Sequence, residues 1–279
     1  MKYLAPAKLN LNLLVSRIDD SGKHPLRSLV QTVEWCDVLE AEEADTDELE
    51  LVGLEVPDSG DNLVLKALER LRTELEIPPV GFRLEMRIPP EAGLGGGSAD
   101  AAAALIAGCD VVGADHEKAA LVAPEVGSDV TFPLVGGTAE MTGYGEAIES
   151  LPPLAAIAFA VVVPEFGLST PEVYNRWDEM GEPVGFEVPD RFLPPPLRHS
   201  YPIRNDLYRA AVDIEPALGD FVRDTARLWD TAVMMTGSGS ACFGFFPSEE
   251  EAVLAAAAVP GTRAATGAAS RPKGVERVA

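Results

Sequence analysis

Alternating apolar and polar positions mark several stretches of this chain as strands. Residues 8–15, Lys-Leu-Asn-Leu-Asn-Leu-Leu-Val, follow a period of two, and residues 81–88 follow the same period. We expect further strands at 29–40, 48–52, 136–146, 157–163, 232–235 and 242–246, and a short last strand after Gly261.

Other stretches have a helical period. A helix over 61–75 gathers five apolar side chains on one face: Leu63, Ala67, Leu68, Leu71 and Leu75. Asp61 is its expected N-cap, and Pro78 ends it. We expect further helices over 119–124 and 249–258. Two more helices are expected to begin at Pro171 and at Asn205. The proline-rich stretch 181–204 is predicted to be a long irregular loop that borders a binding site.

The most informative segment is a glycine-rich loop that leads into an alanine-rich helix. It carries four glycines, at positions 93, 95, 96 and 97, directly before Ser98. Ser98 is the expected N-cap, and Asp100 is expected in the first turn, where the helix dipole favours a negative charge. The N–H groups at such a helix start bind phosphate.

This loop has two interpretations. It can serve only as a tight turn, but four glycines with a capping serine exceed what a turn requires, so we favour phosphate binding. Its spacing matches neither the P-loop nor the dinucleotide fingerprint. A second glycine-rich turn, residues 236–240, either packs against the first loop or simply joins two strands.

The order of the elements indicates the fold class. Strands and helices mix without the regular alternation of a parallel sheet, so we predict an α+β fold. The chain of 279 residues has room for one large domain or two modest ones, and it shows no internal repeat. We place an N-terminal domain at 1–150, which holds the first glycine loop, and a C-terminal domain at 151–279.

The charge of the chain excludes some partners. Asp and Glu number 45 against 22 Lys and Arg, a net charge of −23. Such a field repels nucleic acids and anionic membranes, so we expect neither as a partner. We interpret the acidity as a solubility property. If the protein binds a nucleotide, local cations and helix ends must overcome this field.

Cysteine and histidine placement argues against disulfides and zinc. Cys36, Cys109 and Cys242 lie far apart among apolar residues and are expected to be buried free thiols. The three histidines are scattered, and no nucleophile elbow is present. We find neither a signal-peptide pattern nor an apolar run long enough to cross a bilayer, and so expect a cytoplasmic protein.

Two residues could supply phosphoryl-transfer chemistry. Lys8 taken alone is most simply a solvated lysine, and Asp129 in Gly-Ser-Asp-Val is most simply a cap or turn residue. Phosphoryl transfer needs a base for the attacking hydroxyl and a cation for the developing charge, and these two residues would supply both if they met. His24 lies in a turn and taken alone is an exposed histidine.

Three motifs together favour the functional interpretations of these residues over the structural ones. Pro-Ala-Lys-Leu-Asn at 6–10, Gly-Leu-Gly-Gly-Gly-Ser-Ala-Asp at 93–100 and Thr-Gly-Ser-Gly-Ser-Ala-Cys at 236–242 resemble the three motifs of the GHMP small-molecule kinases. Within this superfamily the chain is most similar to the 4-diphosphocytidyl-2-C-methyl-D-erythritol kinases of the non-mevalonate isoprenoid pathway. Further points of resemblance are a Gly-x-His turn at 22–24, Asp-Asn-Leu at 61–63, Gly-Ser-Asp-Val at 127–130, Gly-Gly-Thr-Ala at 136–139 and Asn-Asp-Leu at 205–207.

The resemblance implies a two-domain kinase with ATP in the interdomain cleft. Lys8 and Asp129 fall on the catalytic pair of the family, and Asn62 falls where the family contacts adenine. The resemblance assigns the ATP phosphates to the glycine-rich stretch: Pro90, Gly93, Leu94, Gly95, Gly96, Gly97 and Ser98. Mg²⁺ is expected mainly on the phosphates, since no carboxylate cage is visible.

The resemblance also assigns the acceptor substrate. Asn10 and His24 fall on positions for the methylerythritol and cytosine groups, and Tyr174 falls where an aromatic ring stacks on cytosine. Lys23 stands where the family usually has a second stacking tyrosine, and Asp100 where an asparagine is common. Because of Lys23, we retain the alternative of a GHMP kinase for another small alcohol, mevalonate-like or a sugar. A nucleotide-binding regulatory protein without phosphoryl transfer is a separate alternative. Monomer and homodimer both stay open.

Overall fold

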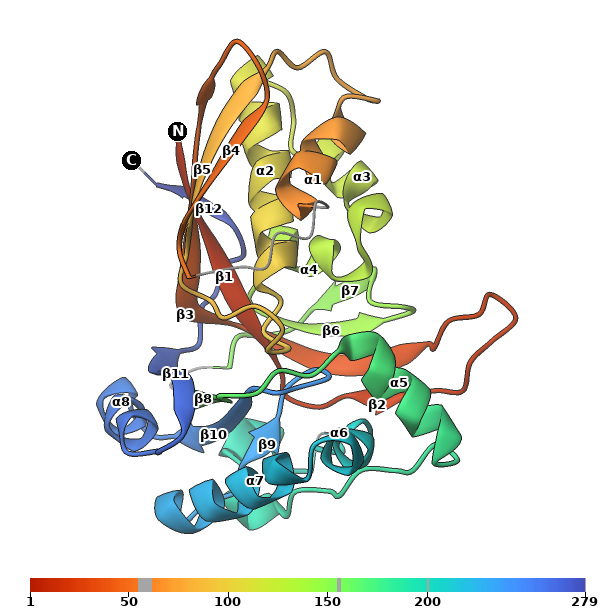
Figure 1. Cartoon of the computed structure of the whole chain (residues 1–279), viewed down its shortest axis with the longest axis vertical. Helices are drawn as coiled ribbons and strands as arrows, with labels where there is room; N and C mark the ends of the chain where they lie inside the picture. The colour runs from red at the N-terminus through yellow and green to blue at the C-terminus, as the bar shows by residue number, and fades with distance from the viewer. Residues whose placement is uncertain (55–61, 155–156, 200, 279) are drawn as a thin grey trace.

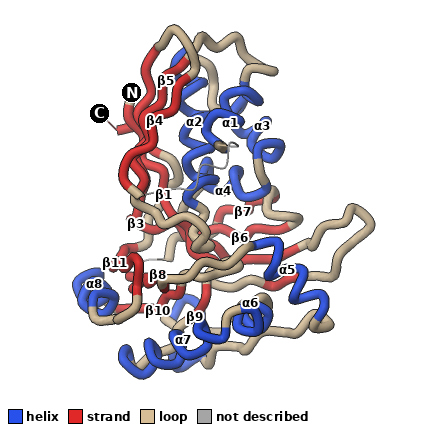
Figure 2. Tube along the Cα trace, viewed as in Figure 1, coloured by secondary structure: helices blue, strands red, loops and turns tan. Residues whose placement is uncertain are grey.

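The computed structural model describes residues 1–54, 62–154, 157–199 and 201–278. These residues form two β-sheets with helices packed on them (Figures 1 and 2). The larger sheet contains β1 (Lys2–Asn10), β2 (Leu14–Val15), β3 (Leu26–Glu43), β4 (Glu48–Gly53), β5 (Val80–Met86), β6 (Thr138–Thr142), β7 (Ala147–Ser150) and β12 (Glu276–Val278). The smaller sheet contains β8 (Ala158–Pro164), β9 (Met234–Met235), β10 (Cys242–Phe246) and β11 (Thr262–Ala269).

Strand β3 organises the larger sheet. One stretch of it pairs antiparallel with β1 and β5, and another pairs with β2 and β6. The β1–β3 register shifts between Pro6 and Lys8, an irregularity that lies where β1 reaches the glycine loop. Only β4 and β5 run parallel among the paired strands of the described residues.

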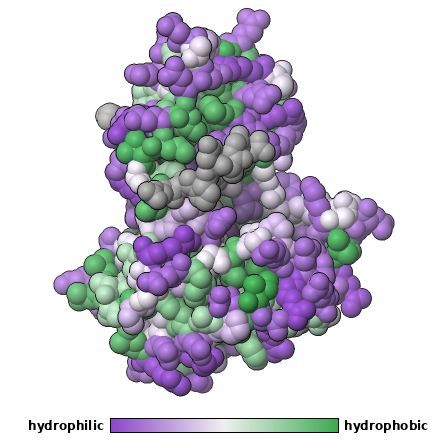
Figure 3. All heavy atoms as spheres, in the orientation of Figure 1, coloured by the Kyte–Doolittle hydropathy of each residue, from purple (hydrophilic) through white to green (hydrophobic). Residues whose placement is uncertain are grey.

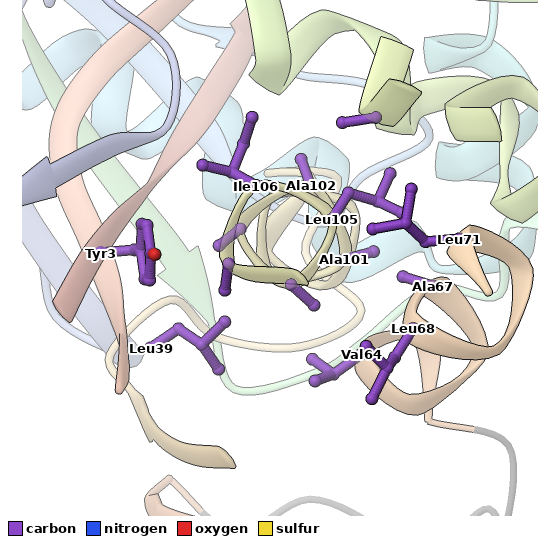
Figure 4. Packing of buried hydrophobic residues seen from close by; sticks show 14 of the residues in the cluster. Tyr3, Leu39, Val64, Ala67, Leu68, Leu71, Ala101, Ala102, Leu105 and Ile106 are labelled. Atoms are coloured by element: carbon purple, nitrogen blue, oxygen red, sulfur yellow. The ribbon is translucent and has the colours of Figure 1, made fainter. Parts of the chain in front are cut away.

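Helices cover one face of the larger sheet (Figure 1). They are α1 (Leu63–Leu71), α2 (Gly96–Val112), α3 (Glu117–Val126), the short 3₁₀ turn η1 (Ser128–Val130) and α4 (Thr131–Val135). Figure 4 shows α2 packed between strand residues such as Tyr3 and one face of α1. The alanines of α2 are fully buried, because a helix without bulky side chains can approach its neighbours on all sides.

The smaller sheet carries α5 (Thr170–Glu179), α6 (Tyr208–Ile214), α7 (Pro216–Trp229) and α8 (Glu249–Ala257) around it. The predicted loop 181–204 is irregular apart from the 3₁₀ turns η2 (Asp190–Phe192) and η3 (Pro195–Leu197), in its described part. Figure 3 shows an upper and a lower lobe joined at a narrower waist, with a mostly hydrophilic visible face. No described helix combines the length and the apolar composition that a bilayer crossing requires.

The chain changes sheets after β7 and returns at its C-terminal end. β12 pairs antiparallel with β1, so Glu276 lies opposite Leu4 in the larger sheet. Neither β12 nor helix α7 was among the elements expected from the local pattern. The predicted domain boundary at 150 stays a prediction, and β12 belongs to the sheet of the N-terminal half.

Two predicted N-caps and one predicted first-turn residue were wrong in detail. Asn62 caps α1, because its Oδ1 accepts a hydrogen bond from Val64 N at 2.8 Å; Asp61 lies outside the described residues. Helix α2 begins at Gly96 behind Gly95, whose φ of 71° turns the chain without a capping side chain. Ser98 is therefore inside the helix, and Asp100 lies past the first turn, where it is buried.

Other boundaries also moved. The predicted strand 8–15 is divided between two strands. Its first part belongs to β1, which starts earlier, at Lys2, and its last two residues form the separate short strand β2. Helix α6 starts at Tyr208, and Asn205 instead orders the preceding turn, because its Oδ1 accepts from Leu207 N. The predicted strand 136–146 is the hairpin β6–β7, whose turn contains two glycines with positive φ, Gly143 and Gly145.

Candidate active site

A cleft of about 990 Å³ lies where the two lobes meet. Its lining comes from β1, the glycine loop, η1, α5 and the second glycine turn, so both sheets contribute to it. Every residue that the sequence singled out for ATP or the acceptor lines this cleft: Lys8, Asn10, Lys23, His24, Asn62, Pro90, Gly93, Leu94, Gly95, Gly96, Gly97, Ser98, Asp129 and Tyr174.

The glycine loop presents a helix start to the cleft. Gly93 and Gly95 have φ of 75° and 71°, a region that side-chain-bearing residues rarely adopt. The N–H of Ala99 makes the first helical bond, to Gly95 O at 3.0 Å. The N–H groups of the first helical turn, from Gly96 onward, therefore have no partner within the helix, and the helix dipole adds partial positive charge there. This geometry suits an anion.

The second glycine turn packs directly against the first loop. A Cβ built on Gly93 would stand 2.4 Å from Thr236 O and 3.1 Å from Gly239 O, so only glycine fits there. Ala241 N also bonds Ala92 O at 3.0 Å. The turn also joins the antiparallel strands β9 and β10. Both interpretations of the second turn, packing and strand connection, are therefore correct.

Lys8 and Asp129 meet in the cleft. Lys8 Nζ lies 3.6 Å from Asp129 Oδ2, and the Lys8 side chain is nearly buried, whereas that of Asp129 is 36% exposed. The aliphatic part of Lys8 lies against Gly95, where a Cβ would stand 2.9 Å from Lys8 Cγ. The ammonium is held as well by Asn10, whose Oδ1 accepts a hydrogen bond from it.

Asn10 itself is held by protein groups. Its Nδ2 donates to Ser28 Oγ at 2.8 Å, and its backbone N–H donates to Thr236 Oγ1 at 2.8 Å. The side chain is buried at the bottom of the cleft. Asn10 therefore links the lysine motif to the second glycine turn, and this fixes the position of the Lys8 ammonium.

Asp129 is positioned by a short 3₁₀ turn. Helix α3 ends at Val126, the backbone extends at Gly127, and η1 then presents Asp129 while Val130 is buried in the core. Gly145 closes on it from the β6–β7 turn: a Cβ there would stand 3.1 Å from Asp129 Oδ1. Burial and, secondly, the negative charge of Asp129 raise the pKa of the Tyr174 hydroxyl, which lines the same cleft.

His24 and Tyr174, two members of an aromatic cluster, line another part of the cleft. The rings of His24 and Tyr174 lie 5.3 Å apart between centroids, and Trp177 meets His24 edge-on at 5.7 Å. His24 Nε2 lies 3.2 Å from Asp178 Oδ2, and its Nδ1 lies 3.1 Å from Ser16 O. The His24 ring is thus held through both of its nitrogens, which fixes its orientation beside Tyr174.

Sequence reasoning missed Trp177 and Asp178 as supports of His24. The available signal was spacing: Tyr174, Trp177 and Asp178 stand at i, i+3 and i+4 of α5, which places them on one helix face. The same reasoning missed Tyr144, which lines the cleft and carries Lys23 Nζ 5.3 Å from its ring centroid. Lys23 therefore rests over a tyrosine of this chain.

Two predicted ATP residues also have structural roles. Asn62 lines the cleft while its Oδ1 caps α1. The carbonyl of Pro90 accepts a hydrogen bond from Arg263 Nη2 at 2.7 Å, which ties the start of the glycine loop to β11 of the other sheet. The predicted free thiols are observed: Cys109 and Cys242 are buried and Cys36 is half-buried.

Comparisons with known proteins identify the family. The GHMP kinases N terminal domain matches residues 62–137, and the GHMP kinases C terminal domain matches residues 209–263. The 4-diphosphocytidyl-2-C-methyl-D-erythritol kinase of Carboxydothermus hydrogenoformans is 33% identical over 87% of both chains. That of Paramagnetospirillum magneticum is 37% identical over 91% of both chains.

This chain belongs to the 4-diphosphocytidyl-2-C-methyl-D-erythritol kinase family. A crystal structure of 4-(cytidine 5'-diphospho)-2C-methyl-D-erythritol kinase agrees: it is 32% identical, has a TM-score of 0.79 and matches 97% of this chain and 100% of its own. Family membership confirms the predicted α+β GHMP kinase fold and the class of ATP-dependent small-molecule kinase. The roles of individual residues stay predictions.

Proposed function

We propose that this kinase transfers the γ-phosphoryl group of ATP to the 2-hydroxyl of 4-diphosphocytidyl-2-C-methyl-D-erythritol. The observation that carries the proposal is the Lys8–Asp129 pair, 3.6 Å apart beside the start of α2. The cleft holds a phosphate-type loop and an aromatic cluster as well, so it has parts for both a nucleotide triphosphate and a nucleobase. Relatives at 33% and 37% identity carry this activity in their names.

The chemical step is one in-line displacement. The substrate hydroxyl oxygen forms a bond to the γ-phosphorus, the bond from that phosphorus to the β–γ bridging oxygen breaks, and ADP leaves. Asp129 accepts the hydroxyl proton as this oxygen attacks. Transition states of this kind are loose, so the gain comes mainly from holding the hydroxyl in line. The 3₁₀ turn η1 and the close contact of Gly145 supply that positioning.

Lys8 supplies the compensating charge. Its ammonium is nearly buried and held by Asn10, so it is preorganised and needs little reorientation during the reaction. A preorganised contact of this kind lowers a barrier by about 3–4 kcal/mol.

ATP is held by the glycine loop. The first-turn N–H groups at Gly96, Gly97 and Ser98 face the phosphates, and the helix dipole offsets the net charge of −23 of the chain. The loop residues Pro90, Gly93, Leu94 and Gly95 shape the approach. Asn62 contacts adenine at the other side of the loop.

Mg²⁺ accompanies the phosphates. The described residues contain no cluster of three or more His, Cys, Asp or Glu side chains suited to a metal. Mg²⁺ keeps several waters and is commonly bound through substrate phosphates, so a nucleotide-carried ion fits this cleft. When bound, it neutralises charge on the phosphate oxygens.

The cytidine moiety is recognised by the aromatic cluster. Tyr174 stacks on the cytosine, His24 lies beside the base, and Lys23 borders the same part of the cleft. Asn10 lies toward the methylerythritol group. The proposal also includes a cytoplasmic location for the protein and a monomer or homodimer as its oligomeric state. Its two domains span residues 1–150 and 151–279.

The test is a purified-protein assay. The chain is incubated with ATP, Mg²⁺ and 4-diphosphocytidyl-2-C-methyl-D-erythritol, with ADP release and the phosphorus spectrum of the product as readouts. We expect phosphorylation at the 2-hydroxyl and its loss in Asp129→Asn with ATP binding retained. Faster turnover of mevalonate or a sugar would overturn the assigned substrate, and ATP binding without ADP release would overturn kinase activity.

A further inference from the structure

Two buried carboxyl groups meet beneath the glycine loop. Asp37 of β3 is fully buried, and Asp100 of α2 is 3% exposed. The two side chains lie close enough that each carboxyl group shifts the pKa of the other. Asp37 Oδ2 and Asp100 Oδ1 are both buried, and neither has a hydrogen-bond partner among the described residues. Two buried carboxylates cannot make this contact while both are charged, so the pair needs one proton.

The proton resides on Asp100. Asp37 Oδ1 accepts two backbone hydrogen bonds, from Arg87 N and from Ile88 N, the second at 2.8 Å. Donors of this kind stabilise a carboxylate, and Asp100 receives none from the backbone in the described residues. A protonated Asp100 can then donate to the ionised Asp37.

The pair connects both ends of the glycine loop. Asp37 holds Arg87 and Ile88, directly before the loop, and a Cβ built on Gly96 would stand 3.4 Å from Asp37 Oδ2. Asp100 lies in α2 just after the loop and lines the floor of the cleft. A proton shared between the two carboxyl groups would therefore join β3, the entry to the loop and the helix that follows it.

We propose that Asp100 is a positioning residue: its proton, shared with Asp37, holds the phosphate-binding loop in place and keeps a second negative charge away from ATP. The test of this proposal by enzyme activity rests on the proposed function. Its tests by ATP binding and by protein stability do not.

The proposal implies a pH dependence of a definite sign. Burial raises the pKa of Asp37 to about 6, and burial together with the charge of Asp37 raises the pKa of Asp100 well above its usual range. As pH rises the pair loses its proton, so loop stability and ATP affinity should both fall.

Other groups near the pair do not reverse this sign. Arg87 lowers the pKa of Asp37 but leaves it raised overall, and burial raises the pKa of Cys36, the preceding residue of β3, to about 11. Lys8 of β1 lies against Gly95 and is paired with Asp129 of η1. The Asp37–Asp100 pair is therefore the group next to the loop whose charge changes as the pH rises.

The experiment compares Asp100→Asn and Asp37→Asn with the native chain. Titration calorimetry with ATP and Mg²⁺ and urea unfolding are measured between about pH 6 and pH 9. We expect the native Kd for ATP to rise about fivefold or more over this range, since a charge appears near the triphosphate. Asp100→Asn should flatten this rise, because an amide donates to Asp37 at every pH. The KM for ATP should follow the same pattern.

Asp110→Asn serves as the matched control. Asp110 lies near the other end of α2. Burial by itself raises the pKa of Asp110, but hydrogen bonds from His116 and Tyr3 lower this pKa overall. This variant should keep the native rise of Kd with pH. A rise in Asp100→Asn as steep as in the native chain would overturn the proposal.

Infrared spectroscopy of the native chain gives an answer even where a variant does not fold. A protonated carboxyl has a carbonyl band that a carboxylate lacks, and we expect such a band at about pH 6, above the usual carboxyl range. Its absence in the folded native chain would overturn the proposal. Loss of turnover with the band and the pH-dependent ATP binding intact would count only against the proposed function.

Discussion

Gly145 lies directly against the carboxylate of Asp129. A Cβ built on Gly145 would stand 3.1 Å from Asp129 Oδ1, and its φ of 118° excludes most other residues. The turn between β6 and β7 therefore limits where this carboxylate can lie. A residue outside the motifs of the family thus helps to set the geometry of the predicted base.

Gly145→Ala should lower kcat about tenfold or more, because a displaced base no longer meets the hydroxyl in line. The Kd for ATP should stay within twofold, since the three atoms nearest the Gly145 Cβ position belong to Ser128 and Asp129 rather than to the glycine loop. Gly261→Ala is the control: its φ is also positive, at 68°, and nothing lies within 4 Å of its Cβ position. Equal losses of kcat in both variants would show that backbone strain, not Asp129, is responsible.

Lys8→Met should lower kcat by about 100-fold or more, the size expected when a preorganised charge is removed. The methionine keeps the unbranched stem that packs on Gly95, so the fold should persist. Lys2→Met, on the same strand but exposed and paired with Glu40, should leave kcat within twofold. The measurement is steady-state ADP release. A native-like kcat in Lys8→Met would remove Lys8 from the transition state.

Gly93→Ala should destabilise the protein by about 2 kcal/mol or more and weaken ATP binding, because the new Cβ meets Thr236 O at 2.4 Å. Gly113→Ala separates clash from strain: its φ is 65° and its Cβ position is open. Urea unfolding and calorimetry with ATP give the two readouts. If both variants lose equal stability, contact between the two glycine turns is not important.

Tyr174→Leu should raise the KM for the cytidine substrate, since a lost base–aromatic stack costs about 1–3 kcal/mol. Tyr174→Phe keeps the ring and should retain a KM near the native value, and neither change should alter the KM for ATP. This pair of variants tests the ring separately from its hydroxyl. A leucine variant with native KM would mean that cytosine binds elsewhere in the cleft.

The local pattern predicted most elements because it depends on neighbouring residues. The period of two around 81–88 and the helical face of 61–75 correspond to β5 and α1. β12 escaped prediction because three residues carry little periodic signal, and only its pairing with β1 makes it a strand. Gly95 replaced Ser98 at the helix start because the close approach of Lys8 leaves no room for a side chain there.

The residues of the site, like the elements of the fold, were only partly predictable from the sequence. Motifs indicated which residues belong to the cleft, since phosphate loops and base–cation pairs use few residue types. Spacing along α5 contained the support of His24 by Asp178, but nothing local relates position 24 to position 178. The resemblance made Asp100 a minor departure, whereas the fold made it half of a buried acid pair, because burial depends on the partners that surround a residue.

By itself the sequence determined the fold class, the phosphate-type loop and the kinase family, because these depend on local periods and on motifs with fixed spacing. Only the tertiary structure decided that Lys8 lies beside Asp129, that the two glycine turns interlock, and that Asp37 and Asp100 share a buried contact. Such contacts join segments far apart in the chain, and their distances, burial and charge states exist only once the sheets and helices have packed.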